Sequence, residues 1–287
     1  MQLMTFLQSG APRLALVDGD AVIDLNAAVP TVPADLRQAL LAGADLVAAC
    51  AQALASDAPR LPLACLTLAP VVPEPGKIVC LGLNYFDHAK EGGRDKPDYP
   101  WLFLRAASSL MGHGQPALLP RVSERLDYEA ELAVVIGTRV PRHVAQERAL
   151  DHVFGYACFN DIWVRDYQKR TPQWTIGKNF DASGGFGPML VTADALPPGA
   201  QGLRIQCRLN GQVMQDANTS EMIWGVAETI ALLSDAMTLE PGDVIAMGTP
   251  AGVGQSRTPP VWMRAGDVVE IEIEGLGVLR NPVRAER

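Results

Sequence analysis

The most informative part of the chain is the stretch Asp127-Tyr128-Glu129-Ala130-Glu131-Leu132-Ala133-Val134-Val135-Ile136-Gly137. It places a carboxylate at every second position and then continues as an unbroken apolar run. Residues two apart in a strand point to the same face, so we expect a strand on which Asp127, Glu129 and Glu131 converge. The apolar run is typical of a strand that is covered on both faces, which argues against a simple solvated edge.

Crowded carboxylates of this kind suggest a metal site. Half-buried carboxylates either take up protons or bind a cation. An all-oxygen set suits a hard ion such as Mg²⁺, Mn²⁺ or Ca²⁺, whereas zinc and copper sites normally include His or Cys. A further carboxylate, Asp161, ends an apolar segment and would project from a rigid strand end, with helix capping as the alternative. On these residues alone, a metal site is slightly favoured over an acidic surface strand.

The composition is that of an ordinary globular protein with room for a large core. The chain has 287 residues, of which 48% are hydrophobic and 20% charged. Its formal net charge of −8 argues against nucleic acid or an anionic membrane as a partner, because both need a basic face. No apolar run reaches about 18 residues, and the first residues lack a signal-peptide pattern, so we expect a cytoplasmic protein. The five cysteines include no Cys-x-x-Cys pair and are expected to be buried thiols.

Turn signals indicate a small N-terminal α/β domain over residues 1–70. It should contain a hairpin around Asp18-Gly19-Asp20 and an Ala/Leu-rich helix over 33–55. Three prolines and a glycine in 70–76 are typical of a linker.

The second domain, residues 71–287, is expected to hold the site. Short apolar segments separated by turns predict many strands, and one helix is expected over 220–236. The regular strand and helix alternation of a doubly wound sheet is missing. We therefore expect a mixed, β-rich α+β fold.

His88 and Glu91 form a candidate catalytic pair. They are three residues apart and share a face if the segment that follows the expected cap, Asn84 or its neighbour, is helical. A carboxylate can hold an imidazole in the tautomer that a general base requires, although a plain surface pair is the commoner explanation of this spacing. The breaker-rich segment 92–100 follows and is expected to form a mobile lid.

Other polar candidates follow Asp161 in the chain. Arg165 and Gln168 offer donors suited to an anionic substrate, although Arg165 is equally suited to a structural ion pair. Lys178 precedes a glycine-rich loop, where lysine is usually solvated but would stabilise an enolate or carboxylate near a metal. The glycines around Thr249 match no nucleotide-binding motif and instead allow backbone N–H groups to approach a small carboxylate.

Taken together, several segments resemble the fumarylacetoacetate hydrolase family, in order and spacing, throughout residues 77–283. They are Asp127-Tyr128-Glu129-Ala130-Glu131-Leu132, Asn160-Asp161, Gln173 to Asp181, Asn210-Gly211 and Pro241 to Gly254. The resemblance implies a β-roll catalytic domain behind a small N-terminal domain. It also implies a homodimer with one divalent ion, Mg²⁺ in the first place, in each active site.

The resemblance also assigns roles by position. It implies that the metal ligands are Glu129, Glu131 and Asp161. It further implies that His88 and Glu91 are the lid dyad, which activates water in hydrolytic members. Lys178 would be the loop lysine of the family, and Thr249 the threonine that contacts the substrate. One departure is Arg105, which stands where relatives usually carry lysine followed by proline, so its contact with a substrate carboxylate differs in geometry.

The resulting prediction is an enzyme, a divalent-metal-dependent hydrolase. It would cleave a C–C bond in an acylpyruvate or related β-diketo acid, in the catabolism of aromatic compounds or sugars. The alternative is an isomerase or decarboxylase of a related oxo-acid, of the hydroxymuconate isomerase or oxaloacetate decarboxylase type, because such relatives keep the same metal ligands. The His88 and Glu91 pair favours hydrolysis. A non-catalytic, metal-stabilised protein that binds small acids is the hypothesis from another class.

Overall fold

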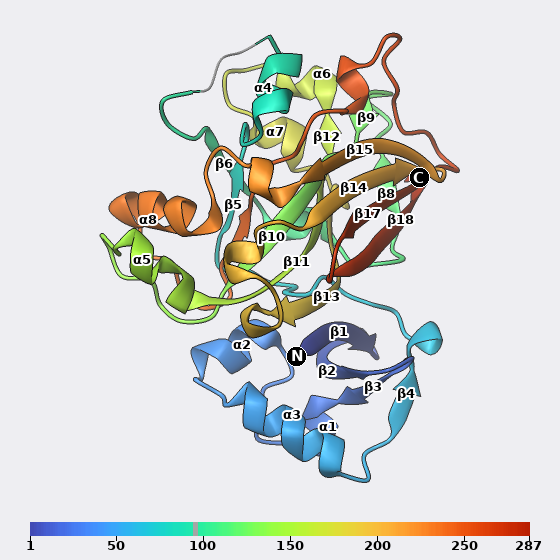
Figure 1. Cartoon of the computed structure of the whole chain (residues 1–287). Helices are drawn as coiled ribbons and strands as arrows, with labels where there is room; N and C mark the ends of the chain where they lie inside the picture. Colours follow the sequence, from blue (N-terminus) through green and yellow to red (C-terminus); the bar gives the residue numbers. More distant parts are fainter. Residues whose placement is uncertain (94–96) are drawn as a thin grey trace.

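The computed structural model describes residues 1–93 and 97–287, and most of its strands join one large mixed sheet (Figure 1). This sheet contains β1 (Gln2–Gln8), β2 (Ala11–Asp18), β3 (Ala21–Asp24), β4 (Arg60–Pro62), β5 (Ile78–Leu81), β6 (Leu102–Arg105), β7 (Leu110–Met111), β10 (Ala130–Ile136), β11 (Val153–Asp161), β13 (Gly184–Thr192) and β16 (Val244–Ala246). The order is β4-β3-β2-β1-β13-β11-β10-β16-β5-β6, and β7 pairs with β13.

Two smaller sheets complete the strands of the described residues. The first has the order β15-β14-β17-β18-β8, and the second pairs β12 with β9. Their bounds are β8 (Ala117–Leu119), β9 (Leu126–Asp127), β12 (Trp163–Val164), β14 (Arg204–Leu209), β15 (Gln212–Asn218), β17 (Val268–Ile273) and β18 (Gly277–Ala285). The expected β-rich α+β architecture is confirmed.

The helices are short and lie around these sheets. The α-helices are α1 (Leu25–Ala28), α2 (Leu36–Leu41), α3 (Leu46–Ala55), α4 (Phe86–Glu91), α5 (Gln146–Ala149), α6 (Arg165–Gln168), α7 (Thr175–Lys178) and α8 (Val226–Ala236). Single 3₁₀ turns occur at Leu63–Cys65, Ala107–Ser109, Leu150–His152, Ala193–Ala195, Pro198–Ala200, Thr219–Glu221 and Gly254–Ser256. Across the described ranges, none of the helices has the length and apolar character of a membrane span.

Strand β10 is buried on both faces, as its apolar run predicts. Leu132 and Val134 belong to the core that is shared with β14 and β17. Ala133 and Val135 belong to a second core, which includes residues of α2 and α3. Because side chains alternate along a strand, Glu131 lies in phase with the second set. The Glu131 side chain therefore lies on the same face of the sheet as Ala133 and Val135.

The N-terminal strands extend the large sheet. Strand β1 pairs with β13, with Leu3 opposite Leu190. The predicted hairpin is confirmed, because Asp18 pairs with Ala21 across the turn between β2 and β3. The single helix predicted over 33–55 is wrong: α2 ends at Leu41, Gly43 adopts a φ of +65°, and the Asp45 carboxylate caps a new helix, α3.

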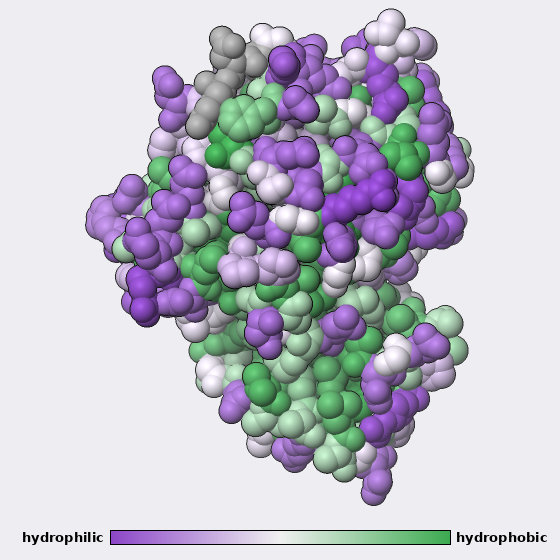
Figure 2. Space-filling model, viewed as in Figure 1, coloured by the Kyte–Doolittle hydropathy of each residue, from purple (hydrophilic) through white to green (hydrophobic). Residues whose placement is uncertain are grey.

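The predicted linker at 70–76 packs against the sheet. Val71 and Val72 are 1% and 0% exposed, and the Thr5 hydroxyl donates a hydrogen bond of 2.9 Å to the Val71 carbonyl. The N-terminal elements form the lower lobe in Figure 1, and in Figure 2 much of that lobe is green. The large sheet contains strands from both sides of residue 70. The division into two domains at this residue stays a prediction.

The start of α8 differs from the prediction, whereas the start of α4 agrees with it. The helix expected over 220–236 begins only at Val226, because Gly225 adopts an extended N-cap conformation after a 3₁₀ turn. The cap of α4 was expected at Asn84 or its neighbour, and the neighbour, Tyr85, occupies that position without a side-chain cap bond. The Asn84 amide instead donates to the carbonyls of Trp224 and Met247, at 3.0 and 2.7 Å.

Candidate metal and active site

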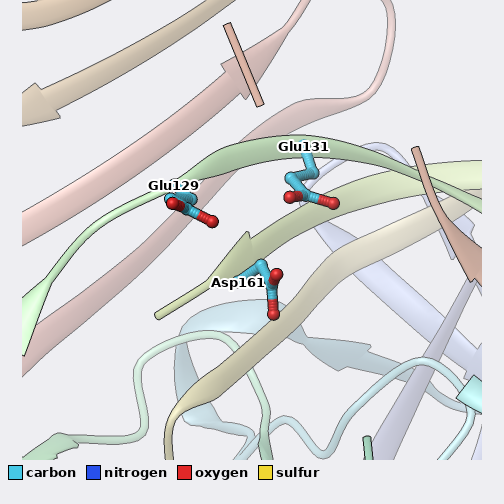
Figure 3. A group of neighbouring side chains, drawn as sticks. All are labelled: Glu129, Glu131 and Asp161. Carbon is cyan, nitrogen blue, oxygen red and sulfur yellow. The ribbon is translucent and has the colours of Figure 1, made fainter. Parts of the chain in front are cut away.

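The centre of the candidate site is a cluster of three buried carboxylates, Glu129, Glu131 and Asp161 (Figure 3). One oxygen from each lies within 4.8 Å of the others, and the three residues are 4%, 1% and 0% exposed. Glu131 lies near the start of β10, Glu129 directly precedes this strand, and Asp161 ends the neighbouring strand β11. The Asp161 N–H donates to the Glu129 carbonyl at 3.0 Å, which fixes the strand ends beside each other.

Asp127 does not join this cluster, contrary to the prediction from alternation. The strand is interrupted after Asp127, which belongs to β9 and pairs with Trp163 of β12. Its carboxylate accepts hydrogen bonds from the Arg165 Nε at 2.7 Å and from the backbone N–H groups of Gly254 and Gln255 at 2.8 and 3.0 Å. Asp127 therefore anchors the loop around Gly254.

Lys178 lies at the centre of the carboxylate cluster. It ends α7 and is 0% exposed, so of the two alternatives considered for this lysine, the solvated one does not hold. Its Nζ donates to the Glu129 Oε2 and the Asp161 carbonyl, at 2.7 Å each, and also to the Asp161 carboxylate. The ammonium lies 4.0 Å from the centroid of the Trp163 ring, whose Nε1 donates to the Glu129 Oε2 at 2.8 Å.

Two arginines supply the other buried positive charges. The Arg165 Nη2 donates to the Glu129 Oε1 at 2.6 Å. The Arg105 Nη1 donates to the Asp161 Oδ1 at 2.7 Å, and its Nη2 donates to the Ser183 hydroxyl at 2.8 Å. Arg105 thus lies behind Asp161, and its contact with a substrate stays a prediction.

These ion pairs leave Glu131 without a cationic partner among the described residues. It accepts one hydrogen bond of 2.9 Å, from the backbone N–H of Gly248. Burial, with the nearby charge of Asp161, raises the pKa of Glu131. Burial also opposes ionisation of Glu129, but the charges of Lys178 and Arg165 outweigh it and lower the pKa of Glu129 to about 2.

The donor set fits a divalent hard cation. Glu129, Glu131 and Asp161 offer only oxygen atoms, which is the ligand type that Mg²⁺, Mn²⁺ and Ca²⁺ prefer. Glu131 brings a buried negative charge that no side chain balances in the part of the chain described. A cation at this point would remove the cost of burying that charge, while sharing Glu129 and Asp161 with Lys178.

The predicted pair of His88 and Glu91 is present on α4. The His88 Nδ1 lies 3.2 Å from the Glu91 Oε2, and the Glu91 Oε1 accepts the Gly252 N–H at 3.0 Å. Burial opposes ionisation of Glu91, but the hydrogen bonds from His88 and Gly252 prevail and lower its pKa. The carboxylate therefore stays ionised and can fix the orientation of the imidazole.

His88 and Glu129 line one cavity of about 660 Å³. Figure 1 shows α4, α6 and α7 together at this end of the molecule, opposite the N-terminal strands. Arg165 and Gln168 also line the cavity, and the Gln168 Oε1 accepts a 3.3 Å hydrogen bond from Arg165. Of the predicted lid, residues 92–100, Gly92 lines the cavity, whereas 94–96 lie outside the described residues.

Thr249 is buried beside the site, at 3% exposure, and its hydroxyl accepts a hydrogen bond of 2.8 Å from the Gln215 amide. The same amide donates to the Pro250 carbonyl, and its oxygen accepts the Ala130 N–H at 2.9 Å. Gln215 therefore ties the Thr249 loop to the start of β10. Neither Gln215 nor Trp163 was predicted, because no local pattern marks a partner that is distant in sequence.

Comparisons with known proteins identify the family of the chain. The model of the fumarylacetoacetate (FAA) hydrolase C-terminal family matches residues 77–284. The chain is 41% identical to oxaloacetate tautomerase fahd2, mitochondrial, of Xenopus laevis, over 99% of this chain and 90% of that protein. It resembles the crystal structure of a putative HpcE protein from Mycobacterium smegmatis, with a TM-score of 0.89 and 32% identity, and both chains are covered completely.

A second solved structure is a maleylpyruvate hydrolase from Sphingobium sp. SYK-6, in complex with manganese(II) and pyruvate. It is 33% identical, with a TM-score of 0.83, and both chains are again covered completely. The expected enzyme family is thus confirmed by a domain match that spans most of the chain and by full-length relatives. The chain belongs to the fumarylacetoacetate hydrolase family.

Proposed function

We propose that this protein interconverts the keto and enol forms of a small 2-oxo dicarboxylic acid of the oxaloacetate class. The observation that carries this proposal is that His88, oriented by Glu91, shares a cavity with Glu129 of the buried carboxylate cluster. The proposal is also supported by the 41% identity, over nearly the whole chain, to an oxaloacetate tautomerase. Tautomerisation requires a base close to the carbon beside an oxo group, and His88 suits that role.

We further propose that Glu129, Glu131 and Asp161 bind a divalent cation, Mg²⁺ in the first place and Mn²⁺ or Ca²⁺ as alternatives. Such an ion, when bound, supplies a Lewis acid for the oxygens of an oxo-acid. The solved relative with manganese(II) and pyruvate supports a metal of this type.

The residues around the cavity have distinct roles in this proposal. In the keto-to-enol direction His88 takes a proton from the substrate carbon, and the oxo oxygen takes up a proton to complete the enol; the reverse direction retraces these steps. Glu91 holds the imidazole in a single orientation. Lys178 places a positive charge beside the carboxylate cluster, where negative charge develops on the substrate oxygen. Arg165 and Gln168 orient the acid from the cavity wall.

Two further residues support the geometry. Thr249 contributes to substrate orientation from the loop that Gln215 fixes. Arg105 holds Asp161 in place through a 2.7 Å hydrogen bond.

The test is the rate at which the enol form of oxaloacetate loses its ultraviolet absorbance. Metal-stripped protein should be inactive and should regain activity with Mg²⁺. The His88→Gln variant should be slower by about 100-fold or more, because general-base catalysis contributes at least that factor. The matched control is His143→Gln, which removes an exposed histidine that also pairs with a carboxylate, Asp235, at 3.1 Å. A wild-type rate in His88→Gln would refute the assignment.

Hydrolysis of an acylpyruvate is the second candidate. The specific observation in its favour is the His88 and Glu91 pair, which is also suited to deprotonating a water molecule. The water oxygen would bond to the distal carbonyl carbon, the C–C bond would break, and the leaving carbon would take up a proton to give pyruvate. Pyruvate release from a short acylpyruvate, lost in His88→Gln, would support hydrolysis. Decarboxylation of oxaloacetate that survives this change would indicate the decarboxylase alternative.

We also propose that the protein is a homodimer, as the family resemblance implies. Strand β6 lies at the end of the large sheet, and its Leu102 and Leu104 are 37% and 54% exposed. Nearby apolar surface on an edge strand is suited to burial against a second copy. Sedimentation velocity should give a dimer that Leu104→Lys weakens; a monomer at all concentrations would contradict the proposal.

A further inference from the structure

One wall of the cavity carries two positive charges besides those of the buried ion pairs. Arg165, at the start of α6, is buried and bound by carboxylates. The wall continues through Gln168 to Lys169 and Arg170, which line the same cavity but are exposed. The residues thus lead from the floor, where Glu129 lies, toward the mouth.

Lys169 and Arg170 are not neutralised by the protein. No carboxylate of the described residues lies within ion-pair distance of the Lys169 or the Arg170 side chain. The cations of the floor differ, because each of Arg105, Arg165 and Lys178 contacts at least one carboxylate. In a chain with a net charge of −8, two adjacent unpaired cations on a cavity wall produce a local field that attracts anions.

Arg170 is also held in a fixed orientation. Its guanidinium carbon lies 3.6 Å from the centroid of the Tyr167 ring, and Tyr167 makes an edge contact with Phe180, at 5.1 Å between ring centroids. Stacking uses the flat face of a guanidinium and leaves the N–H groups on its edge available. Those groups match the two oxygens of a carboxylate, which they can bind in bidentate fashion.

We infer that Lys169 and Arg170 form a carboxylate subsite at the cavity mouth. It binds the distal carboxylate of a 2-oxo dicarboxylic acid, while the oxo-acid end of the molecule lies at the floor. This inference rests on the proposed function, because it names the substrate class of the same cavity. Helix α6 ends at Gln168, so Lys169 and Arg170 extend the cavity wall beyond the helix, away from Arg165 and the floor. A dicarboxylate bound at both ends must span from the floor to the mouth, which favours chains longer than that of oxaloacetate.

The test measures binding by calorimetry to the Mg²⁺-loaded protein, without reliance on turnover. The probes are pyruvate, which has one carboxylate, and the dicarboxylates 2-oxoglutarate and 2-oxoadipate. The variants are Lys169→Gln and Arg170→Gln, and the control is Arg121→Gln, at an exposed arginine that lines none of the described site. A further variant, Arg170→Lys, keeps the positive charge but removes the planar guanidinium that binds a carboxylate in bidentate fashion.

Arg170→Gln should weaken the binding of both dicarboxylates by roughly five- to ten-fold, because one partly exposed, charge-assisted contact is lost. Pyruvate affinity should stay within about two-fold, because the floor of the site is unchanged. Arg170→Lys should fall between wild type and Arg170→Gln, and Arg121→Gln should bind like wild type. Higher ionic strength should reduce the dicarboxylate preference of wild type more than that of Arg170→Gln.

Two results would overturn the subsite. One is a wild-type protein that binds pyruvate as well as it binds both dicarboxylates. The other is an Arg170→Gln variant that loses affinity for all three probes equally, or for none. The tautomerase assay tests the proposed function separately. If the protein has no tautomerase activity but its dicarboxylate binding requires Arg170, the subsite stands and the proposed function fails. If the protein is an active tautomerase whose dicarboxylate binding does not require Arg170, only the subsite fails.

Discussion

Replacing Lys178 with Met tests how the buried charges are balanced. Methionine keeps most of the apolar stem but removes the ammonium that bonds Glu129 and Asp161. Because Lys178 is 0% exposed, no water can replace it without rearrangement. Removing one partner of a buried ion pair costs about 3–5 kcal/mol, since a buried charge is left uncompensated. We expect the free energy of unfolding of the metal-free protein to fall by that amount.

The loss should depend on pH through Glu129. The pKa of Glu129 is lowered from 4.5 to about 2, and Lys178 makes the largest contribution that lowers it. A lowered folded-state pKa stabilises the protein above pH 4.5, and this stabilisation disappears as the pH falls toward 2. The gap between wild type and Lys178→Met should therefore be widest above pH 4.5 and narrow in acid.

The assay is urea unfolding in the presence of a chelator, at pH 7 and at several values down to the acid limit of the folded protein. The control is Lys77→Met, which removes a lysine that is 29% exposed and lies 2.6 Å from Asp243. Asp243 keeps two backbone donors, from Lys77 and Glu240, so this control should lose only about 1 kcal/mol. An equal loss in both variants, or a gap for Lys178→Met that does not change with pH, would refute the reasoning.

Other changes around the site have distinct expected outcomes. In chelator at pH 8, Glu131→Gln should raise the free energy of unfolding. Burial raises the pKa of Glu131, so the ionised carboxylate destabilises the folded protein at high pH. An unchanged free energy in urea unfolding would contradict this. Glu91→Gln should lower kcat by about 10-fold or more and leave Mg²⁺ affinity unchanged, as steady-state kinetics and calorimetry would show. Gly248→Ala should lower the thermal midpoint by several degrees, since φ is +84° and a Cβ would lie 2.7 Å from that of Asn84; a wild-type melting curve would refute the steric argument.

Short-range sequence patterns predicted much of the site. Glu129 and Glu131 share a face because strand alternation requires it, and Asp161 lies beside them because it ends the neighbouring strand. The three-residue spacing of His88 and Glu91 was enough to predict that their side chains meet. In each case the contact follows from the geometry of a single element or of two adjacent strands.

The features that were missed depend on long-range packing. Lys178 is buried because α7 packs against β6 and β12, and the glycines that follow it gave no sign of this. Asn84 bonds to Trp224, 140 residues away, where the local pattern favoured a helix cap. Asp127 lies outside the predicted strand, and its carboxylate is bound by Arg165 and two backbone N–H groups. None of these partners can be identified from a sequence window.

The central claim is that a divalent cation, bound by the carboxylate cluster, is required for tautomerisation of a 2-oxo acid. The most direct measurement is the rate of enol-to-keto conversion of oxaloacetate by metal-stripped protein during a titration with Mg²⁺, for wild type and Glu131→Gln. We predict no activity in chelator, saturable recovery in wild type, and a large increase in the Mg²⁺ concentration that Glu131→Gln requires. Full activity of the wild-type protein in chelator, or identical Mg²⁺ curves for the two proteins, would contradict the claim.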